Sequence, residues 1–525
     1  MLQTVNIPFP EYRPDDPRPQ TRMGAMSGLI PDVNGYHNGI NLNLSNETWG
    51  ETSAGVGQTD LYLGGFTALS DTGTSVTFVG NTANLYQRAS GWGDTLVTEL
   101  TRGAGGDYAT PKGNLWQFAQ FGNYVIAVNG DDKPQYFLFG TSTLFDDLDD
   151  LGSFAGTLPR AKYVIAVGEF VVFGYENKVA WSGLNNIAQW TPGEEGSDVQ
   201  ELPDSGNVTG LIPYQNGFIV ATERNLQYFN FIGGSYTFSR QVVNERVGCA
   251  GPYSMVRAED DFYFLSRNGF RKGVAASPIG RGRVDTAYLR KLLDASISST
   301  TQWMQTNFIQ LTDNPFQVVS NPTAYDYVTG YWADDLGLII WGADGRFISG
   351  QTNAEAAKDV SLAYSPALDR WVDSPVGLVR AGWQSVRAEA DEYPVGNYIY
   401  LDDGNTTSYV TAFNGCNPWS FTIQWWPGNE NVYLQKIRLI GTYGGNVKLV
   451  SVKAYDNRYD GEAAPHTTFT PSALSDEADE NTNSWHWVGV RGRWFEITFQ
   501  QEDNPTAFTE QLVGLEAVIK TAGRR

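Results

Sequence analysis

Short apolar runs alternate with polar turns along most of the first 412 residues. Seven segments share one pattern: an apolar run, a turn containing Gly, Asn or Asp, and a second apolar or aromatic run. Turns of this composition reverse a chain tightly between two strands. The pattern therefore predicts seven β-hairpins, at residues 75–88, 123–137, 169–181, 217–229, 261–273, 337–348 and 397–410.

The spacing of these hairpins predicts a repeat. The apolar runs begin at residues 76, 124, 170, 218, 262, 338 and 398, so the first four steps are 48, 46, 48 and 44 residues. A unit of about 40 to 50 residues holds four short strands and their turns, which is the size of one β-propeller blade. We expect residues 41–412 to form a propeller of about seven blades. A closing strand from the N-terminal region could complete one of the blades, and six or eight blades also stay open.

The long step between the fifth and sixth hairpins contains a different pattern. In residues 284–297, Val284, Tyr288 and Leu292 fall on one helical face and Asp285 stands near the start. Apolar residues at this spacing are typical of an amphipathic helix. We predict a helix inserted between two blades.

Tryptophans recur near the hairpins. WSGLNNIAQWT, residues 181–191, carries two tryptophans and two asparagines. Two further stretches, AYDYVTGYW (324–332) and AYSPALDRW (363–371), each place a Trp eight residues after an Ala, a spacing called the Ala-to-Trp frame below. The first stretch raises the alternative of a loop that recognises a sugar or a base. Because a large aromatic residue that recurs once per blade is typical of packing between sheets, we expect Trp181, Trp190, Trp332 and Trp371 to pack within the propeller.

The pattern changes at both ends of the chain. From residue 413 the strands are longer and alternate clearly, with Phe495, Ile497 and Phe499 on one face of residues 494–499. Residues 413–525 are predicted to form a β-sandwich or jelly-roll-like domain. Its tryptophans pack in the core or at a subunit interface or, alternatively, present a platform for sugar: Trp425, Trp426, Trp485, Trp487 and Trp494. Residues 1–40 are Pro-rich without periodicity, and we expect an extended arm ordered against a neighbour.

Composition agrees with an all-β chain and limits its partners. Aromatic residues make up 13% and there are 57 glycines, which favours strands and turns. The net charge of −22 disfavours a surface that grips nucleic acid, because phosphate contacts need clustered Lys and Arg. Only two cysteines are present, so no disulfide framework is required. No apolar run is long enough for a transmembrane helix and the first residues lack a signal-peptide pattern, so we expect a soluble chain.

Catalytic and metal-binding motifs are missing from the sequence. It contains three histidines and no HExxH, CxxC or GxSxG pattern, so we expect neither enzyme activity nor a cofactor or metal site. Two acidic clusters are candidates for channel-facing or loop positions. Their carboxylates could also supply oxygen ligands to calcium, but neither cluster has the spacing of an EF-hand loop. They comprise Asp146, Asp147, Asp149 and Asp150, and Asp476, Glu477, Asp479 and Glu480.

Several stretches resemble one protein family. They are LYQRASGWGDTLV (85–97), VAWSGLNNIAQWTPG (179–193), ERNLQYFNFIGGSYTFSRQ (223–241) and GCAGPYSMVRAEDDFYFLSRNGFRKG (248–273), together with the C-terminal RGRWFEITFQ and LVGLEAVIKTAGRR. In this order they resemble the tail hub or nozzle proteins of short-tailed bacteriophages, the group that includes packaged-DNA stabilisation proteins. The resemblance extends from about residue 60 to the C-terminus.

This resemblance implies a structural role in the virion tail, after assembly in the host cytoplasm. The chain would form a homohexameric ring below the portal and adaptor, contact the adaptor and tail fibres, retain packaged DNA and let it pass during ejection. An acidic wall would repel phosphate and let DNA slide. A separate possibility, compatible with this role, is that the C-terminal domain contacts the host envelope at the tail tip. The alternative from the residues alone is a carbohydrate-binding or glycoside-hydrolysing propeller.

Overall fold

Nearly all regular structure in the computed structural model is β-strand. The described residues are 2–8, 21–27, 30–31, 37–38, 48–49, 63–88, 97–111, 113–234, 236–280, 284–286, 288–289, 325, 328–333, 337–343, 360–367, 369–373, 382–384, 398–403, 408–412, 420–427, 431–442, 447–455, 465, 467–470, 485–501 and 511–521. Contacts divide the chain into two compact units. Unit 1 comprises Met1–Asn46, Leu362–Val376 and Phe413–Arg525, and unit 2 comprises Glu47–Ser361 and Gly377–Ala412.

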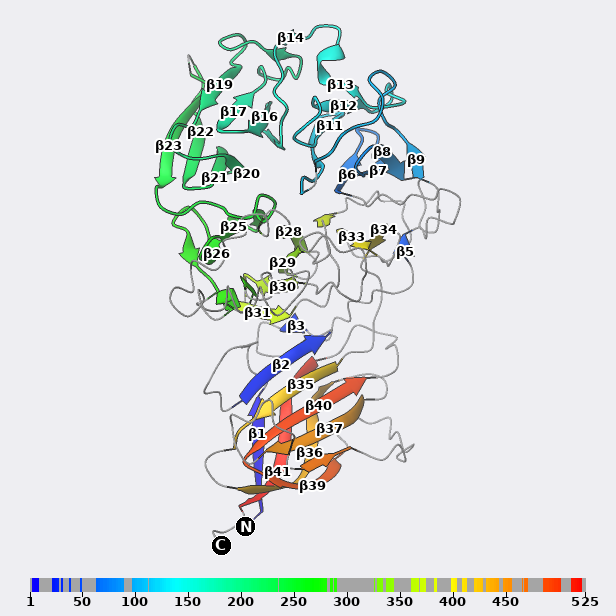
Figure 1. Ribbon diagram of the computed structural model, residues 1–525, viewed down its shortest axis with the longest axis vertical. Helices are drawn as coiled ribbons and strands as arrows, with labels where there is room; N and C mark the ends of the chain where they lie inside the picture. Colours follow the sequence, from blue (N-terminus) through cyan, green and yellow to red (C-terminus); the bar gives the residue numbers. More distant parts are fainter. Residues whose placement is uncertain are drawn as a thin grey trace, which may run out of the picture. The chain divides into compact units, whose positions relative to one another are not determined.

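Seven four-stranded antiparallel sheets follow one another along the described chain (Figure 1). The first three consist of β6 (Gly65–Leu69), β7 (Ser75–Gly80), β8 (Leu85–Arg88) and β9 (Val97–Glu99); β10 (Gln117–Phe121), β11 (Tyr124–Val128), β12 (Gln135–Leu138) and β13 (Asp146–Asp147); and β15 (Tyr163–Val167), β16 (Phe170–Tyr175), β17 (Lys178–Trp181) and β19 (Asp198–Glu201). The next two consist of β20 (Val208–Tyr214), β21 (Gly217–Thr222), β22 (Leu226–Phe231) and β23 (Phe238–Asn244); and β24 (Val256–Ala258), β25 (Asp261–Ser266), β26 (Gly269–Lys272) and β27 (Ser277–Pro278). The last two consist of β28 (Val328–Ala333), β29 (Leu338–Ala343), β30 (Val360–Ser365) and β31 (Arg370–Asp373); and β32 (Gly382–Gln384), β33 (Tyr398–Asp403), β34 (Ser408–Ala412) and β5 (Thr48–Trp49).

The first strands of these sheets form a closed ring. Strand β6 contacts β10, and the contacts continue in chain order through β15, β20, β24, β28 and β32, which contacts β6 again. Seven radial sheets whose inner strands close on themselves are the architecture of a β-propeller. The predicted all-β propeller is therefore confirmed, and each sheet is called a blade below, numbered from the blade that contains β6.

In six of the seven predicted hairpins, the two apolar runs are the second and third strands of a blade. In blade 6 the third strand is β30, which follows the predicted segment 337–348 instead of lying in it. In blade 1 the segment 75–88 contains β7 and β8, and in blade 4 the segment 217–229 contains β21 and β22. In the segment 337–348, the first run is β29, whereas residues 344–348 lie outside the described part of the chain. The seventh blade is completed by β5, which pairs with β34 through Thr48 and Thr411. An N-terminal strand thus completes a blade, which is one of the arrangements that the sequence allows.

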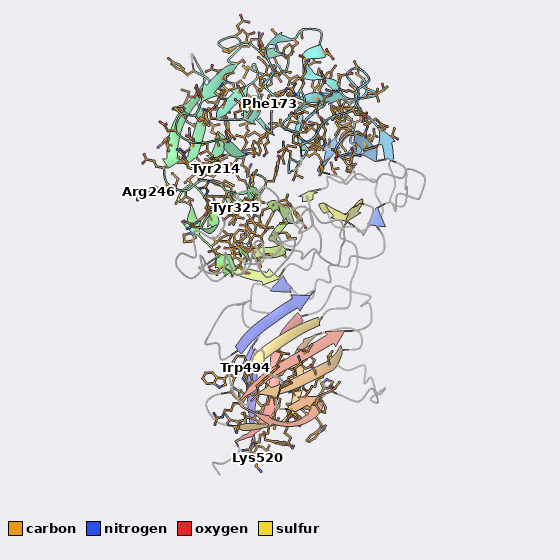
Figure 2. All side chains as sticks on the ribbon, in the orientation of Figure 1. Phe173, Tyr214, Arg246, Tyr325, Trp494 and Lys520 are labelled. Atoms are coloured by element: carbon orange, nitrogen blue, oxygen red, sulfur yellow. The ribbon has the colours of Figure 1, made fainter. Side chains whose placement is uncertain are left out.

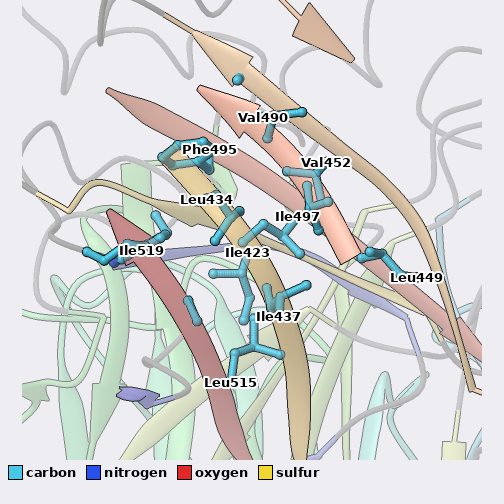
Figure 3. Close-up of a cluster of buried hydrophobic side chains, with 14 of the residues drawn as sticks. Ile423, Leu434, Ile437, Leu449, Val452, Val490, Phe495, Ile497, Leu515 and Ile519 are labelled. Carbon is cyan, nitrogen blue, oxygen red and sulfur yellow. The ribbon is translucent and has the colours of Figure 1, made fainter. Parts of the chain in front are cut away.

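Unit 1 contains a sandwich of two sheets. One sheet has the order β2 (Thr21–Ser27), β35 (Ser420–Trp425), β40 (Trp494–Gln501), β37 (Val447–Tyr455) and β38 (Thr467–Phe469). The other has the order β3 (Ile30–Pro31), β4 (His37–Asn38), β41 (Gln511–Thr521), β36 (Val432–Thr442) and β39 (His486–Gly492), with β1 (Leu2–Pro8) on β41. Ile423, Phe495 and Ile497 from the first sheet and Leu434 and Leu515 from the second share one core (Figure 3). The predicted C-terminal sandwich is confirmed.

The N-terminal residues differ from the expected arm. Strand β1 pairs with β41 from Leu2 opposite Lys520, and β2 pairs with β35 from Thr21 opposite Trp425. Both strands therefore extend the sheets of their own chain. Free N–H and C=O groups of a strand pair with a further strand through the backbone alone, so the described strands β1 and β2 need no apolar periodicity of their own.

The predicted inserted helix is described only at its beginning. Residues 284–286 and 288–289 are helical, and residues 287 and 290–297 lie outside the described part of the chain. Val284 and Tyr288 are buried, as the apolar spacing predicted. Within the described ranges, no helix has the length and apolar character needed to cross a membrane.

Candidate functional site

Trp181 and Trp190 pack on opposite sides of blade 3. Trp181, at the end of β17, is 1% exposed and belongs to the core shared with blade 4. Its ring meets Phe238 edge-on at 5.1 Å, and its indole N–H donates to the carbonyl oxygen of Gly196 at 2.8 Å. A fully buried indole whose polar atom is satisfied is a packing element, so Trp181 is not available to bind a ligand.

Trp190 joins blade 3 to the segment that precedes it. It forms β18 (Gln189–Trp190), which pairs in parallel with β14 (Ala155–Gly156). Its ring stacks on Phe173 and its indole N–H donates to the Ile187 carbonyl at 2.7 Å. Gly156 has a φ of 105° and lies directly against the Trp190 backbone, so a side chain has no room there.

The two remaining predicted packing tryptophans lie in blade 6. Trp371, in β31, is 1% exposed and contacts Tyr364 with 4.7 Å between the ring centroids. Trp332, in β28, is half-buried. The shared Ala-to-Trp frame of the sequence thus corresponds to the first and last strands of one blade rather than to two successive blades.

The first acidic cluster lies on the outermost strand of blade 2. Asp146 and Asp147 form β13, and Asp149 and Asp150 belong to the short 3-10 helix η1 (Leu148–Asp150). Asp147 pairs with Arg102 at 3.1 Å, and the Lys133 ammonium lies 2.8 Å from Asp149. These ion pairs tie the cluster to its own blade and to the connection from blade 1.

Two carboxyl groups of this cluster have pKa values shifted in opposite directions. Burial raises the pKa of Asp146, and the neighbouring Asp150 raises it further. Burial also acts to raise the pKa of Asp147, but hydrogen bonds from Gln135 and Arg102 outweigh it, and the net pKa is lowered. Asp147 is therefore held as an anion by its partners.

The second acidic cluster lies outside the described residues: Asp476, Glu477, Asp479 and Glu480. Within the part of the chain that the structure describes, no group of three or more His, Cys, Asp or Glu residues is arranged to hold a metal ion.

A pocket of about 670 Å³ lies between blades 2 and 3. Asn185 and Asn186 of the WSGLNNIAQWT stretch line it, together with Phe121, Tyr124 and Glu169. Asn186 donates to Glu195 at 2.8 Å and accepts from the backbone N–H of Ala188 at 3.0 Å, so its amide is already used within the loop. The stretch thus contributes its asparagines, and not its tryptophans, to a partly polar pocket.

Exposed large hydrophobic residues of unit 2 are concentrated on blades 3 and 4. Six of the nine such residues in the described chain lie there, and we call these six the apolar rim: Leu184, Val199, Phe231, Ile232, Tyr236 and Val242. Tyr236 is 74% exposed and Ile232 is 54% exposed. Large exposed apolar residues gathered in one region mark interaction surfaces more often than scattered ones do.

The β22–β23 hairpin is held in place by blade 3. The Thr237 hydroxyl donates to the Gly196 carbonyl at 2.5 Å, the same oxygen that the Trp181 indole contacts. Strand β23 is the outer edge of its sheet (Figure 1). Its residues Ser239–Val242 are four consecutive exposed residues. An unpaired edge strand beside exposed aromatic residues is suited to contact with another chain.

The apolar rim does not follow from the hairpin pattern of the sequence. In FIGGSYTF, residues 231–238, Phe, Ile and Tyr flank two glycines of a turn. Apolar residues within a turn, where polar residues are usual, are the signal that was available.

Comparisons with known proteins identify no family. No family model and no curated protein matches the chain. Solved structures with partial similarity include the computationally designed Ika8 protein, with 11% identity, a TM-score of 0.34, and coverage of 67% of this chain and 83% of that one. The Pan2 WD40 domain of Neurospora crassa has 6% identity, a TM-score of 0.27, and coverage of 41% and 62%.

Proposed function

We propose that the chain is a structural subunit of a bacteriophage tail hub or nozzle, which assembles into a hexameric ring and lets viral DNA pass. The ordered motifs that resemble this family support the proposal, and so does the combination of a closed propeller with a β-sandwich. In this role the chain contacts an adaptor and tail fibres in the virion tail and performs no catalysis.

The main support for the proposed self-assembly is the apolar rim. Tyr236 and Ile232 project from a hairpin that Thr237 fixes to blade 3, so a neighbouring chain meets a pre-arranged surface. Aromatic residues in a preordered position lose little conformational freedom on binding. The net charge of −22 fits this role, because a channel wall rich in carboxylates would repel phosphate and let DNA slide once the packaged genome is released.

Light scattering and electron microscopy of the purified chain, alone and with an adaptor, test the assembly. We expect rings, and we expect the double substitution Ile232→Ser and Tyr236→Ser to shift the population towards the 57.9 kDa monomer without lowering Tm. Tyr433→Ser, an exposed aromatic residue of unit 1, is the matched control and should leave the rings intact. A wild-type chain that stays monomeric at all concentrations with adaptor present contradicts the proposal.

A second candidate function is a carbohydrate-binding or glycoside-hydrolysing propeller. The pocket between blades 2 and 3 favours it, because Phe121, Tyr124 and Glu169 offer aromatic surface and a carboxylate. A glycan array would detect binding, and loss of that binding in Glu169→Gln, with Glu176→Gln as control, would locate it. Hydrolysis additionally needs a second carboxylate across the cleft, and Glu169 is the only carboxylate among the residues that line the pocket in the described chain.

A further inference from the structure

One sheet of the sandwich has an outward face of unusual composition. In β36 and β41 the residues Leu434, Ile437, Leu515 and Ala517 point into the core. Side chains alternate between the two faces of a strand, so the intervening residues point outward. Lys436, Arg438, Glu516, Val518 and Lys520 are among them, and none belongs to the core cluster.

The strand register arranges these outward residues in three rows. Directly paired residues of antiparallel strands lie side by side on one face. Tyr433 pairs with both Lys520 and Arg491, Lys436 with both Val518 and Trp487, and Arg438 with Glu516. We call this the outer sheet face, and its rows are Leu2, Lys520, Tyr433 and Arg491; Thr4, Val518, Lys436 and Trp487; and Asn6, Glu516 and Arg438.

Aromatic and cationic side chains interleave on this face. The Lys436 ammonium lies 4.2 Å from the ring centre of Trp485 and 5.4 Å from that of Trp487. The Arg438 guanidinium lies 4.7 Å from the Trp485 ring and donates to Glu516 at 2.6 Å. Cation–π contacts of this kind hold both groups in place, so the surface is ordered before any ligand arrives.

The face exposes apolar area as well as charge. Trp487 is 64% exposed, Leu2 57% and Tyr433 38%, and these are the exposed large hydrophobic residues of unit 1 among those described. All three lie on the outer sheet face, in its first two rows. An indole that is left two-thirds in water in a well-ordered strand is a candidate contact surface for a flat apolar partner.

The local charge is opposite to that of the whole chain. The face carries Lys436, Arg438, Arg491 and Lys520 against one acid, Glu516, whereas the chain has a net charge of −22. Lys520 is labelled in Figure 2. A cationic patch on an acidic protein selects an anionic partner and disfavours another acidic copy of the same chain.

We propose that the outer sheet face binds a polysaccharide whose sugars carry carboxylate groups. Trp487 and Tyr433 offer flat surfaces on which the apolar faces of sugar rings stack, while Lys436, Arg491 and Lys520 pair with the carboxylates. Lys520 and Arg491 stand two strands apart, about 10 Å at the usual strand spacing. Cations that are spaced apart suit a ligand with one negative charge on each sugar. They suit a phosphate group less well, because a phosphate is bound by several donors that converge on one point.

Titration of the full chain with oligogalacturonate, followed by tryptophan fluorescence and calorimetry, tests this proposal. We expect saturable binding that weakens as salt rises from 0.05 to 0.5 M, because screening weakens exposed ion pairs. Trp487→Ala and Lys436→Gln should each reduce affinity at least tenfold. Arg246→Gln removes an exposed cation of the propeller that has no place in either proposed surface, and it should leave the affinity unchanged.

Comparison ligands separate the sources of the signal. A neutral galactose oligomer of equal length should bind at least tenfold more weakly, and so should a phosphorylated mannan. Equal binding of the neutral oligomer, stronger binding of the phosphorylated mannan, or no effect of Trp487→Ala overturns the proposal. So does a Trp487→Ala chain that loses self-association while the wild type ignores oligogalacturonate, since the face is then a subunit interface. The results with the polysaccharides do not bear on the apolar rim, which uses other residues; only the self-association result does.

Discussion

The ring of Trp190 lies flat on the ring of Phe173, with centroids 4.6 Å apart and planes inclined by 7°. Both residues belong to the core shared by blades 2 and 3. Trp190→Ala should therefore lower the free energy of unfolding by about 3 to 5 kcal/mol, since it leaves a cavity and an unpaired Ile187 carbonyl. Urea denaturation measures the loss.

Trp487→Ala is the matched control for that substitution. Because Trp487 is 64% exposed, its removal should change the free energy of unfolding by less than about 0.5 kcal/mol. Equal losses in the two variants would mean that burial of the indole is not what makes Trp190 important.

Gly280→Ala should destabilise the propeller. A Cβ at residue 280 would overlap the carboxylate of Asp285, which is buried and accepts from the Phe270 backbone N–H at 2.8 Å. Displacing this carboxylate breaks a buried hydrogen bond, and we expect a loss of about 1 to 3 kcal/mol in thermal or chemical denaturation.

Gly152→Ala provides the comparison, because nothing lies within 4 Å of a Cβ built there. Its unfolding midpoint should match or exceed that of the wild type. A Gly280→Ala chain as stable as Gly152→Ala would show that Asp285 does not hold the position seen in the structure.

Asp147→Asn should change the dependence of stability on pH. The folded pKa of Asp147 is lowered from 3.8, so its carboxylate contributes stability above that value, and the contribution is lost as pH falls through the folded pKa. The gap in unfolding free energy between wild type and variant should therefore be largest near neutral pH and shrink below pH 4. Asp107→Asn, an exposed aspartate, should follow the wild type at every pH; a pH-independent gap for Asp147→Asn would refute the assignment.

Cys249 should resist alkylation in the native chain. It is fully buried, and burial raises the pKa of its thiol to about 11. Because the thiolate is the reactive form, we expect no labelling of Cys249 by iodoacetamide at pH 8 over an hour, and full labelling in 6 M guanidinium. Peptide mass spectrometry separates Cys249 from Cys416, and rapid native labelling of Cys249 would contradict its burial.

The propeller was predictable because each blade repeats the same local pattern. In the segment 169–181 the apolar runs and the turn between them are β16 and β17, with Glu176 in the left-handed conformation that the turn needs. The strands that open and close each blade carry weaker signals. Strand β19, for example, is DVQE with alternating exposure, and its position depends on pairing with β17 rather than on its own composition.

The sites were harder to predict than the fold. On the outer sheet face, Leu2 lies beside Lys520 and shares the face with Trp487. Leu2 is almost a whole chain away from these two residues in sequence, and only the strand register brings them together. The sequence does not distinguish the tryptophans of unit 1 from one another, whereas in the structure Trp425 is 4% exposed and Trp487 is 64% exposed. Whether a tryptophan is buried or exposed depends on which face of its strand it occupies. Within β36 the bulge between Leu434 and Lys436 changes which residues of the strand occupy each face.

The pairing of Thr48 with Thr411 has a consequence for synthesis of the chain. Strand β5 leaves the ribosome early, yet its partner β34 is made only after the other six blades, so the ring cannot close until nearly all of the propeller has emerged. The early segment must stay unpaired, or be shielded, through that interval. Slowing translation after residue 412 should therefore favour closure, whereas a folded domain fused directly before residue 48 should hinder it.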